Sequence, residues 1–151
     1  MEDITLPLEE RLREALIKRE EIEFAYLFGS HARGTANKLS DVDVAVFLDK
    51  LRLPPVGPYG YKSELLVAMR QQLREPLDFV ILNEAPLPLR YRVLRDGKLL
   101  FCRDNRVRIT FHEKTMRDYL DFRPIQKIQV QYLRKRLAEG RFGGSRDGMA
   151  R

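Results

Sequence analysis

Three features of the 151-residue sequence predict one α/β (α+β) domain, a mixed β-sheet packed by helices with a C-terminal helical extension. Short β-branched or aromatic runs alternate with stretches whose apolar residues recur at helical spacing. Glycine and proline clusters separate these stretches. The length suits a single domain, and 44% hydrophobic residues are enough to build a buried core.

The first half of the chain predicts a helix, two strands, a loop and a second helix, in that order. Residues 7–20 repeat apolar side chains at helical spacing, with acidic residues in the first turn. Residues 22–28 are β-branched and aromatic, and residues 41–48 alternate at their start, as strands do. The prolines and glycines of residues 51–60 indicate a long loop, and residues 62–74 return to helical spacing.

The second half predicts a strand, a helix, a short edge strand and a helical end. The strand covers residues 77–82, the helix residues 87–95 and the edge strand residues 98–102. Helical spacing begins again near Arg106. Pro124 is expected to break or kink that helix, because proline removes a backbone hydrogen bond.

The charge is unevenly distributed along the chain. Residues 1–102 hold 15 Lys and Arg against 16 Asp and Glu, whereas residues 103–151 hold 13 against 6. We expect a folded core at residues 1–103, C-terminal helices at residues 104–139 packed on or extending the same domain, and a disordered tail at residues 140–151. The basic third would attract an acidic protein, ligand phosphates or nucleic acid, or is a solvated helix face.

Some function classes are excluded by composition. No apolar run is long enough to span a membrane, and the acidic start of the chain lacks the features of a signal peptide, so a cytoplasmic protein is expected. The single cysteine, Cys102, excludes an internal disulfide and a multi-cysteine zinc site. Nucleic-acid binding has no support beyond charge, because no known binding motif is present.

Residues 28–46 carry the chemistry. Gly29 and Ser30 follow a predicted strand, where a sharp turn and free backbone N–H groups form a phosphate-binding cradle. Asp41 and Asp43 come ten residues later, and their i, i+2 spacing on a strand places both side chains on one face. Two neighbouring carboxylates repel each other unless a cation lies between them, and hard oxygen ligands near phosphates suit Mg²⁺.

Asp78 is a third candidate carboxylate. It interrupts an otherwise apolar strand, where a lone acidic residue needs a partner or a function. If this strand lies beside the second one, Asp78 converges with Asp41 and Asp43. Three such carboxylates with a phosphate-binding turn predict a two-metal site for phosphoryl or nucleotidyl transfer.

This segment resembles the signature of the nucleotidyltransferase superfamily that includes DNA polymerase beta. The string from Gly29 to Asp43, Gly-Ser-His-Ala-Arg-Gly-Thr-Ala-Asn-Lys-Leu-Ser-Asp-Val-Asp, is similar to the minimal nucleotidyltransferases. The resemblance extends over about residues 20–102, and the C-terminal helices resemble the antitoxin branch more loosely. Members of that branch inactivate a HEPN-type ribonuclease toxin by moving AMP from ATP onto a toxin tyrosine.

The resemblance implies a role for each matching residue. It implies that Gly29 and Ser30 hold the triphosphate of ATP, and that Asp41 and Asp43 bind two Mg²⁺ ions. Asp78 would bridge a metal or accept the proton of the attacking hydroxyl. Arg33 and Ser40 also match the family string and are assigned to nucleotide binding. The implied partner is a HEPN-type toxin, in a hetero-oligomer.

Two other functions remain open at this point. One is nucleotidyl transfer to a small molecule such as an aminoglycoside, although about 50 residues after Phe101 leave little room for an acceptor-binding domain. The other is an antitoxin that binds its toxin without any transfer. A Ser-His-Asp triad of Ser30, His31 and Asp41 is disfavoured, because adjacent side chains diverge.

Overall fold

The computed structural model describes residues 6–29, 32, 34 and 41–138, and it describes only the backbone of residues 122–133 and 136–138. The helices and strands are, in chain order, α1 (Leu8–Ile17), β1 (Ile22–Phe28), β2 (Val42–Leu48), α3 (Tyr61–Leu73), β3 (Leu77–Ile81), α4 (Leu87–Asp96), β4 (Lys98–Cys102) and α5 (Asn105–Ala138). Short 3-10 turns follow β2 at Lys50–Arg52 and β3 at Leu82–Glu84.

The four strands form one mixed sheet in the order β3-β2-β1-β4. β1 runs antiparallel to both β2 and β4, whereas β2 and β3 are parallel and are connected through α3. The predicted fold class, a mixed sheet packed by helices with a C-terminal helix, is therefore confirmed. The predicted strand at residues 22–28 has the observed bounds, and the other strands differ by one residue at most.

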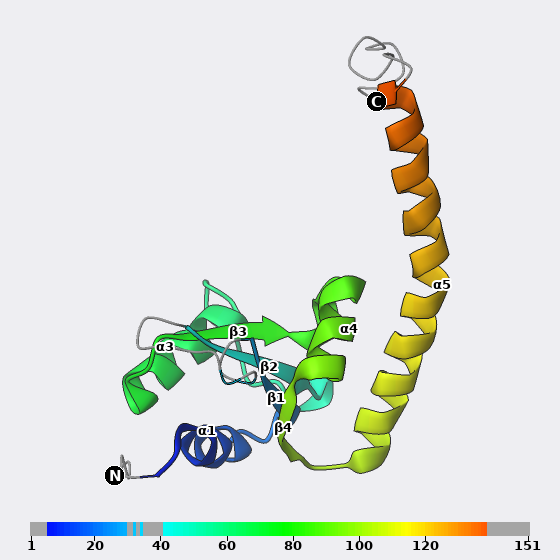
Figure 1. Ribbon diagram of the computed structural model, residues 1–151. Helices are drawn as coiled ribbons and strands as arrows, with labels where there is room; N and C mark the ends of the chain where they lie inside the picture. Colours follow the sequence, from blue (N-terminus) through cyan, green and yellow to red (C-terminus); the bar gives the residue numbers. More distant parts are fainter. Residues whose placement is uncertain (1–5, 30–31, 33, 35–40, 139–151) are drawn as a thin grey trace.

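Side-chain alternation gives the sheet two apolar faces, each covered by different helices (Figure 1). Val42, Val44 and Val46 point to the face that packs against α1 and α3. Phe24 and Phe47 point to the other face, which packs against α4 and the first part of α5. The core therefore lies in two layers, one on each side of the sheet.

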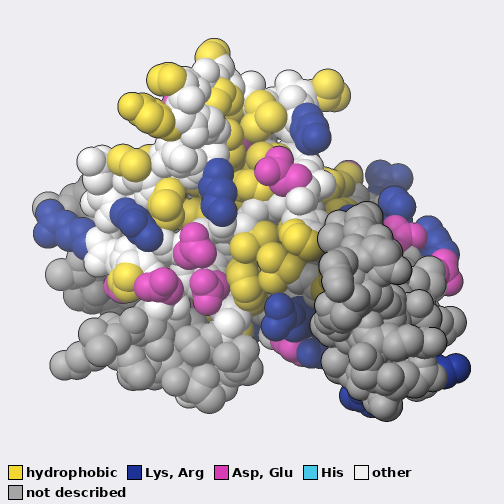
Figure 2. All heavy atoms as spheres, turned by 90° about the horizontal axis from the view of Figure 1, so that it is seen from above, with side chains coloured by type: hydrophobic (Ala, Val, Ile, Leu, Met, Phe, Trp, Pro, Cys, Tyr) yellow, Lys and Arg dark blue, Asp and Glu magenta, His cyan; other side chains and the backbone are white. Residues whose placement is uncertain are grey.

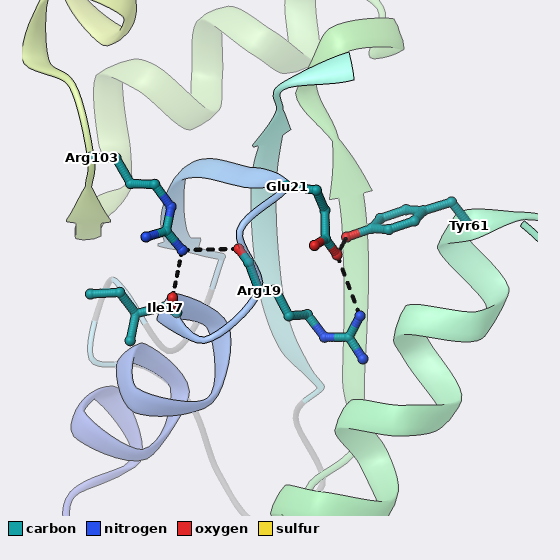
Figure 3. Close-up of polar contacts among 5 residues, drawn as sticks. All are labelled: Ile17, Arg19, Glu21, Tyr61 and Arg103. Carbon is teal, nitrogen blue, oxygen red and sulfur yellow. Dashed lines mark hydrogen bonds and ion pairs between the residues drawn. The ribbon is translucent and has the colours of Figure 1, made fainter. Parts of the chain in front are cut away.

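The end of α1 is held by polar contacts from distant parts of the chain (Figure 3). The guanidinium of Arg103 donates to the carbonyls of Ile17, Arg19 and Ile22, at 2.5, 2.9 and 2.7 Å. Ile17 is the last residue of α1, and its carbonyl is one of those that a helix end leaves without a partner inside the helix. The predicted helix at residues 7–20 therefore ends earlier than its sequence pattern, at Ile17.

Figure 3 also shows a buried carboxylate beside these contacts. Glu21 is only 6% exposed, and its Oε2 accepts a hydrogen bond of 2.7 Å from the Tyr61 hydroxyl. Arg19 lies 3.4 Å from the same oxygen. Burial, and then the neighbouring carboxylate of Glu21, raises the pKa of Tyr61. The buried Glu21 carboxylate thus interacts with both a cation and a hydroxyl donor.

The last helix is continuous, so of the two outcomes expected at Pro124, a break or a kink, the break is wrong. α5 has 34 residues and passes through Pro124 without interruption. A proline inside a helix removes one backbone hydrogen bond and costs about 3 kcal/mol, which a long helix with many other hydrogen bonds can bear. Figure 1 shows α5 continuing well past α4, away from the sheet. In the part of the chain that the structure describes, no helix has the length and apolar character of a membrane span.

Candidate active site

The start of β2 carries two of the predicted carboxylates. Asp43 is the second residue of β2 and is partly buried, whereas Asp41 lies just before the strand and is exposed. Because Val42, Val44 and Val46 point into the core, the alternation of the strand turns Asp43 to the opposite face. The predicted strand at residues 41–48 thus begins one residue later, at Val42, which leaves Asp41 outside the regular strand.

The third carboxylate lies directly beside Asp43. β2 and β3 pair in parallel with Asp43 opposite Asp78, so the strand of Asp78 lies next to the strand of Asp43, as expected. Neighbouring strands are about 4.8 Å apart, and paired residues turn their side chains to the same face. Asp78 is exposed, and its Oδ1 accepts a hydrogen bond of 3.0 Å from the backbone N–H of Phe79. It was expected inside a buried strand and instead faces solvent.

Gly29 approaches the same carboxylate from the other neighbouring strand. β1 pairs with β2 so that Phe28 lies opposite Asp43, and Gly29 follows immediately. Gly29 has a φ of +78°, and a Cβ at this position would lie 2.5 Å from Oδ2 of Asp43. Only a residue without a side chain leaves room for the carboxylate there. Sequence reasoning assigned Gly29 to phosphate binding and missed this contact, which depends on strand register.

The remaining predicted site residues are Ser30, Arg33 and Ser40, and they lie outside the described residues, as does His31. Among the residues that are described, no three His, Cys, Asp or Glu side chains come close enough together to hold a metal ion. Asp43 and Asp78 are therefore brought together by register, but the convergence of all three carboxylates stays a prediction.

The chemistry of the paired carboxylates nevertheless suits a hard divalent cation. Asp43 and Asp78 offer only oxygen donors, which Mg²⁺ prefers. Like charges on neighbouring strands are unfavourable until a cation is bound between them. Figure 2 shows acidic side chains grouped on one face of the molecule, beside a patch of hydrophobic side chains.

Two arginines on α4 contact protein groups. The Arg90 guanidinium lies over the ring of Phe111, with 5.9 Å between its Cζ and the ring centroid. Arg95 forms an ion pair of 2.8 Å with Asp96, which raises the pKa of Arg95. The contact between Arg90 and Phe111 joins α4 to α5, whereas the exposed pair of Arg95 and Asp96 is local.

Aromatic stacking joins α4 to α5. The rings of Tyr91 and Tyr119 are parallel, with centroids 3.8 Å apart. Phe111 of α5 lies between the sheet and α4, with its centroid 4.7 Å from that of Phe47. Tyr91 and Tyr119 thus lie at the interface of the two helices, and the first part of α5 is integral to the packed domain.

The fold agrees with comparisons to known proteins. The family model "Polymerase beta, Nucleotidyltransferase" matches residues 10–106, which is more than half of the sequence. The chain therefore belongs to the polymerase beta nucleotidyltransferase family. The comparison with curated proteins gave no match.

Solved structures of toxin–antitoxin pairs have a similar fold. A chain of a toxin–antitoxin crystal structure with AMP-PNP aligns with 84% of this chain and 98% of its own length, at a TM-score of 0.69 and 23% identity. A chain in a crystal structure of the MntA–HepT toxin–antitoxin pair aligns with 83% of this chain and 95% of its own length, at a TM-score of 0.62 and 21% identity. A chain in the structure of a complex between the tri-AMPylated Shewanella oneidensis HEPN toxin and MNT antitoxin aligns with 83% of this chain and 98% of its own length. The TM-score is 0.63 and the identity is 21%.

Proposed function

We propose that this protein is a Mg²⁺-dependent adenylyltransferase that moves AMP from ATP onto a tyrosine of a HEPN-type ribonuclease toxin, and thereby acts as its antitoxin. The observation that carries the proposal is the pairing of Asp43 with Asp78 beside the close approach of Gly29. Membership of the nucleotidyltransferase family supports the reaction type. Similarity to structures described with AMP-PNP and with an AMPylated HEPN toxin supports the nucleotide and the partner.

Each site residue has a role in this proposal. Asp41, Asp43 and Asp78 hold the metal ions, which neutralise the phosphate charge and orient the triphosphate when bound. Gly29 and Ser30 bind the triphosphate through the backbone, because the positive φ of Gly29 makes a sharp turn at the end of β1.

Arg33 and Ser40 contribute to nucleotide binding. These two assignments rest on the family resemblance.

The reaction is an in-line displacement at the α-phosphorus of ATP. A bond forms between the tyrosine oxygen and the α-phosphorus while the bond to the leaving pyrophosphate breaks. The hydroxyl proton passes to a carboxylate, for which Asp78 is suited because it is exposed at the sheet edge. Positioning the two reactants supplies a large part of the rate.

A protein acceptor is favoured over a small molecule by the architecture. The described chain contains one sheet with its covering helices and one long helix that continues past the packed core. Transferases that act on small molecules need a second surface to bind and orient the acceptor. For a toxin tyrosine in an accessible segment, the contact between the two proteins itself orients the hydroxyl toward the nucleotide. AMP on that tyrosine adds negative charge and bulk that would exclude RNA from the ribonuclease site.

The proposal is tested by mass spectrometry of the toxin. The full chain is incubated with its HEPN-type partner, ATP and Mg²⁺, and the partner is then digested. We expect one or more additions of about 329 Da on a tyrosine, the mass of an AMP unit added by this transfer, together with loss of ribonuclease activity. Omission of Mg²⁺ serves as the control for the metal requirement.

Two results would replace the proposal. Neutralisation of the toxin without any mass change, and equally by the Asp41→Asn/Asp43→Asn variant, would indicate an antitoxin that acts by binding alone. Transfer of AMP to an aminoglycoside, with the toxin unmodified, would indicate a small-molecule nucleotidyltransferase.

A further inference from the structure

Arg70 on α3 is bonded to the strand that carries Asp78. Its guanidinium donates twice to the Leu77 carbonyl, from Nε at 3.0 Å and from Nη2 at 2.7 Å. Leu77 is the first residue of β3 and comes directly before Asp78. A side chain of the preceding helix thus holds the backbone immediately before a candidate metal ligand.

The outer side of β3 is held by side chains in place of a neighbouring strand. β3 is an edge strand of the described sheet, and edge strands leave backbone groups unpaired on one side. Here Arg70 bonds the Leu77 carbonyl, and Oδ1 of Asp78 accepts from the Phe79 N–H at 3.0 Å. The edge is therefore fixed on both sides of Asp78 along the chain.

The inner side of the same segment is bonded to β2. The Val42 N–H donates to the Pro76 carbonyl at 2.8 Å, and Val42 lies opposite Leu77 in the parallel register. The next pair in that register is Asp43 with Asp78. Arg70 therefore holds from outside the backbone that β2 holds from inside, one residue before the two carboxylates are paired.

The connection between α3 and β3 is short and constrained. It consists of residues 74–76, and Arg74 has a φ of 57°, which a residue other than glycine adopts at a cost in free energy. The Leu77 N–H donates to the Glu75 carbonyl at 2.8 Å, which closes a tight turn directly before Asp78. Constrained backbone of this kind keeps its conformation only where its surroundings hold it.

The helix that carries Arg70 is a fixed support for these bonds. Met69 and Leu73 on either side of Arg70 are each 2% exposed and pack in the core with the sheet. The planar guanidinium presents its donors in a rigid fork, so two bonds to one carbonyl define a position more closely than one bond does.

We propose that Arg70 is a positioning residue for the metal site, because its bonds to the Leu77 carbonyl set the place of Asp78 relative to Asp43. With Oδ1 of Asp78 bonded to the Phe79 N–H, Oδ2 is the oxygen presented to the cation. Mg²⁺ demands near-ideal octahedral geometry, so a small displacement of one ligand weakens binding. The inference rests on the proposed function for the metal and the reaction, and it adds a residue outside the segment 28–46.

The test titrates Mg²⁺ alone into the ¹⁵N-labelled full chain and follows the amide of Phe79, which is bonded to the Asp78 carboxylate. In Arg70→Met, the Mg²⁺ concentration at half of the shift change should rise about tenfold, as expected when a group that orients a metal ligand is lost. Arg70→Lys should recover part of the affinity, because an ammonium also donates to a carbonyl. Unchanged amide shifts in β1 verify that each variant is folded.

Arg11 offers a matched control. Its guanidinium donates to the Leu73 carbonyl at 3.3 Å and pairs with Glu75 at 2.9 Å, so its bonds hold the same connection but end before β3 begins. Arg11→Met removes the same charge and should lower the midpoint of thermal unfolding. Its Mg²⁺ affinity should stay within about twofold of the original, because Arg11 does not bond the strand of Asp78.

The same variants are assayed for AMP transfer to the HEPN-type partner at several Mg²⁺ concentrations. In Arg70→Met the Mg²⁺ requirement should rise about tenfold, whereas KM for the partner should change by no more than about twofold, because Arg70 acts on a metal ligand.

Equal Mg²⁺ affinity in Arg70→Met and the original protein, or equal losses in Arg70→Met and Arg11→Met, would overturn the inference. If Mg²⁺ binding depends on Arg70 as expected but the original protein transfers no AMP, the proposed function fails and the positioning role stands. If AMP is transferred but the Phe79 amide does not respond to Mg²⁺, the positioning role fails and the transfer reaction stands.

Discussion

The two ends of β2 use acidic residues in opposite ways. At the end of the strand, Glu21 is bonded by Tyr61 and Arg19, and Asp49 accepts from Leu51 N–H beside Arg52. At the start of the strand, Asp43 and Asp78 are paired by register, and neither Asp41 nor Asp78 forms an ion pair within the described ranges.

The difference separates structural carboxylates from candidate catalytic ones. A buried acid whose bonds are all made within the protein contributes to folding, since removing a partner leaves it without compensation. Acids held side by side by strand register carry a repulsion that an external cation relieves. We therefore expect substitutions at the start of β2 to change activity and substitutions at its end to change stability.

The largest effect is expected for Asp41→Asn/Asp43→Asn. Asparagine keeps the side-chain volume but removes both charges, so metal binding and AMP transfer should fall by about a thousandfold or more. The midpoint of thermal unfolding should stay unchanged or rise, because repulsion with Asp78 is relieved. Transfer is measured as AMP incorporated into the toxin, and unfolding by circular dichroism.

Asp49→Asn is the matched control for this variant. It removes one carboxylate at the other end of β2, while its amide oxygen still accepts from Leu51 N–H. Transfer should therefore remain within about twofold of the original rate, since Asp49 lies far from the metal ligands. Equal losses in both variants would show that charge, rather than position at the site, determines the activity.

The next effect is expected for Gly29→Ala. The new methyl group would lie against Oδ2 of Asp43 and displace that carboxylate, so transfer should fall by about a hundredfold. Gly34→Ala is the control, because Gly34 also has positive φ, at 76°, but has nothing within 4 Å of an added Cβ. Both variants carry backbone strain of about 1 kcal/mol, and only Gly29→Ala disturbs the carboxylate. Similar rates for the two variants would contradict the role of the contact.

The sequence predicts the parts of this fold that depend on local pattern. Runs of β-branched, aromatic and other apolar residues located the strands within one residue, because helices cover both faces of the sheet and bury most of these side chains. The acidic interruption at Asp78 marked a site candidate for the same reason. The break expected at Pro124 is not observed, because the many hydrogen bonds of a 34-residue helix outweigh the free-energy cost of one proline.

Contacts between distant residues carry no comparable local signal. The bond from Arg103 to the Ile22 carbonyl joins residues 81 apart, and nothing near either residue indicates it. The contact of Gly29 with Asp43 follows from the register of β1 on β2, which a single sequence does not specify. The geometry of the site could therefore be known only from the folded sheet, whereas the types of its residues could be identified in the sequence.

A smaller effect, on stability alone, is expected for Asn83→Ala. The Asn83 side chain accepts from Leu48 N–H at 2.8 Å and donates to the Leu48 carbonyl at 3.0 Å, which closes the end of β2. Alanine leaves both backbone groups without these partners, so the free energy of unfolding should fall by about 2 kcal/mol. Urea unfolding measures this loss, and AMP transfer by the folded variant should be unaltered. A drop in transfer without a drop in stability would link this end of the strand to catalysis.

The smallest effect, and the most dependent on pH, is expected for Tyr61→Phe. Phenylalanine removes the hydrogen bond to Glu21 but keeps the ring, and Arg19 still pairs with the carboxylate, so the loss should be about 1 kcal/mol at neutral pH. Burial, followed by the interaction with Glu21, raises the pKa of Tyr61.

The stability that this bond contributes is complete below the ordinary tyrosine pKa of about 10 and is lost as the pH rises through the raised value. The difference in unfolding free energy between the original protein and Tyr61→Phe should therefore stay constant up to about pH 10 and shrink as the pH rises above it. Urea unfolding of both proteins across that range measures the difference. A constant difference would mean that the tyrosine proton does not contribute to holding Glu21 at this end of β2.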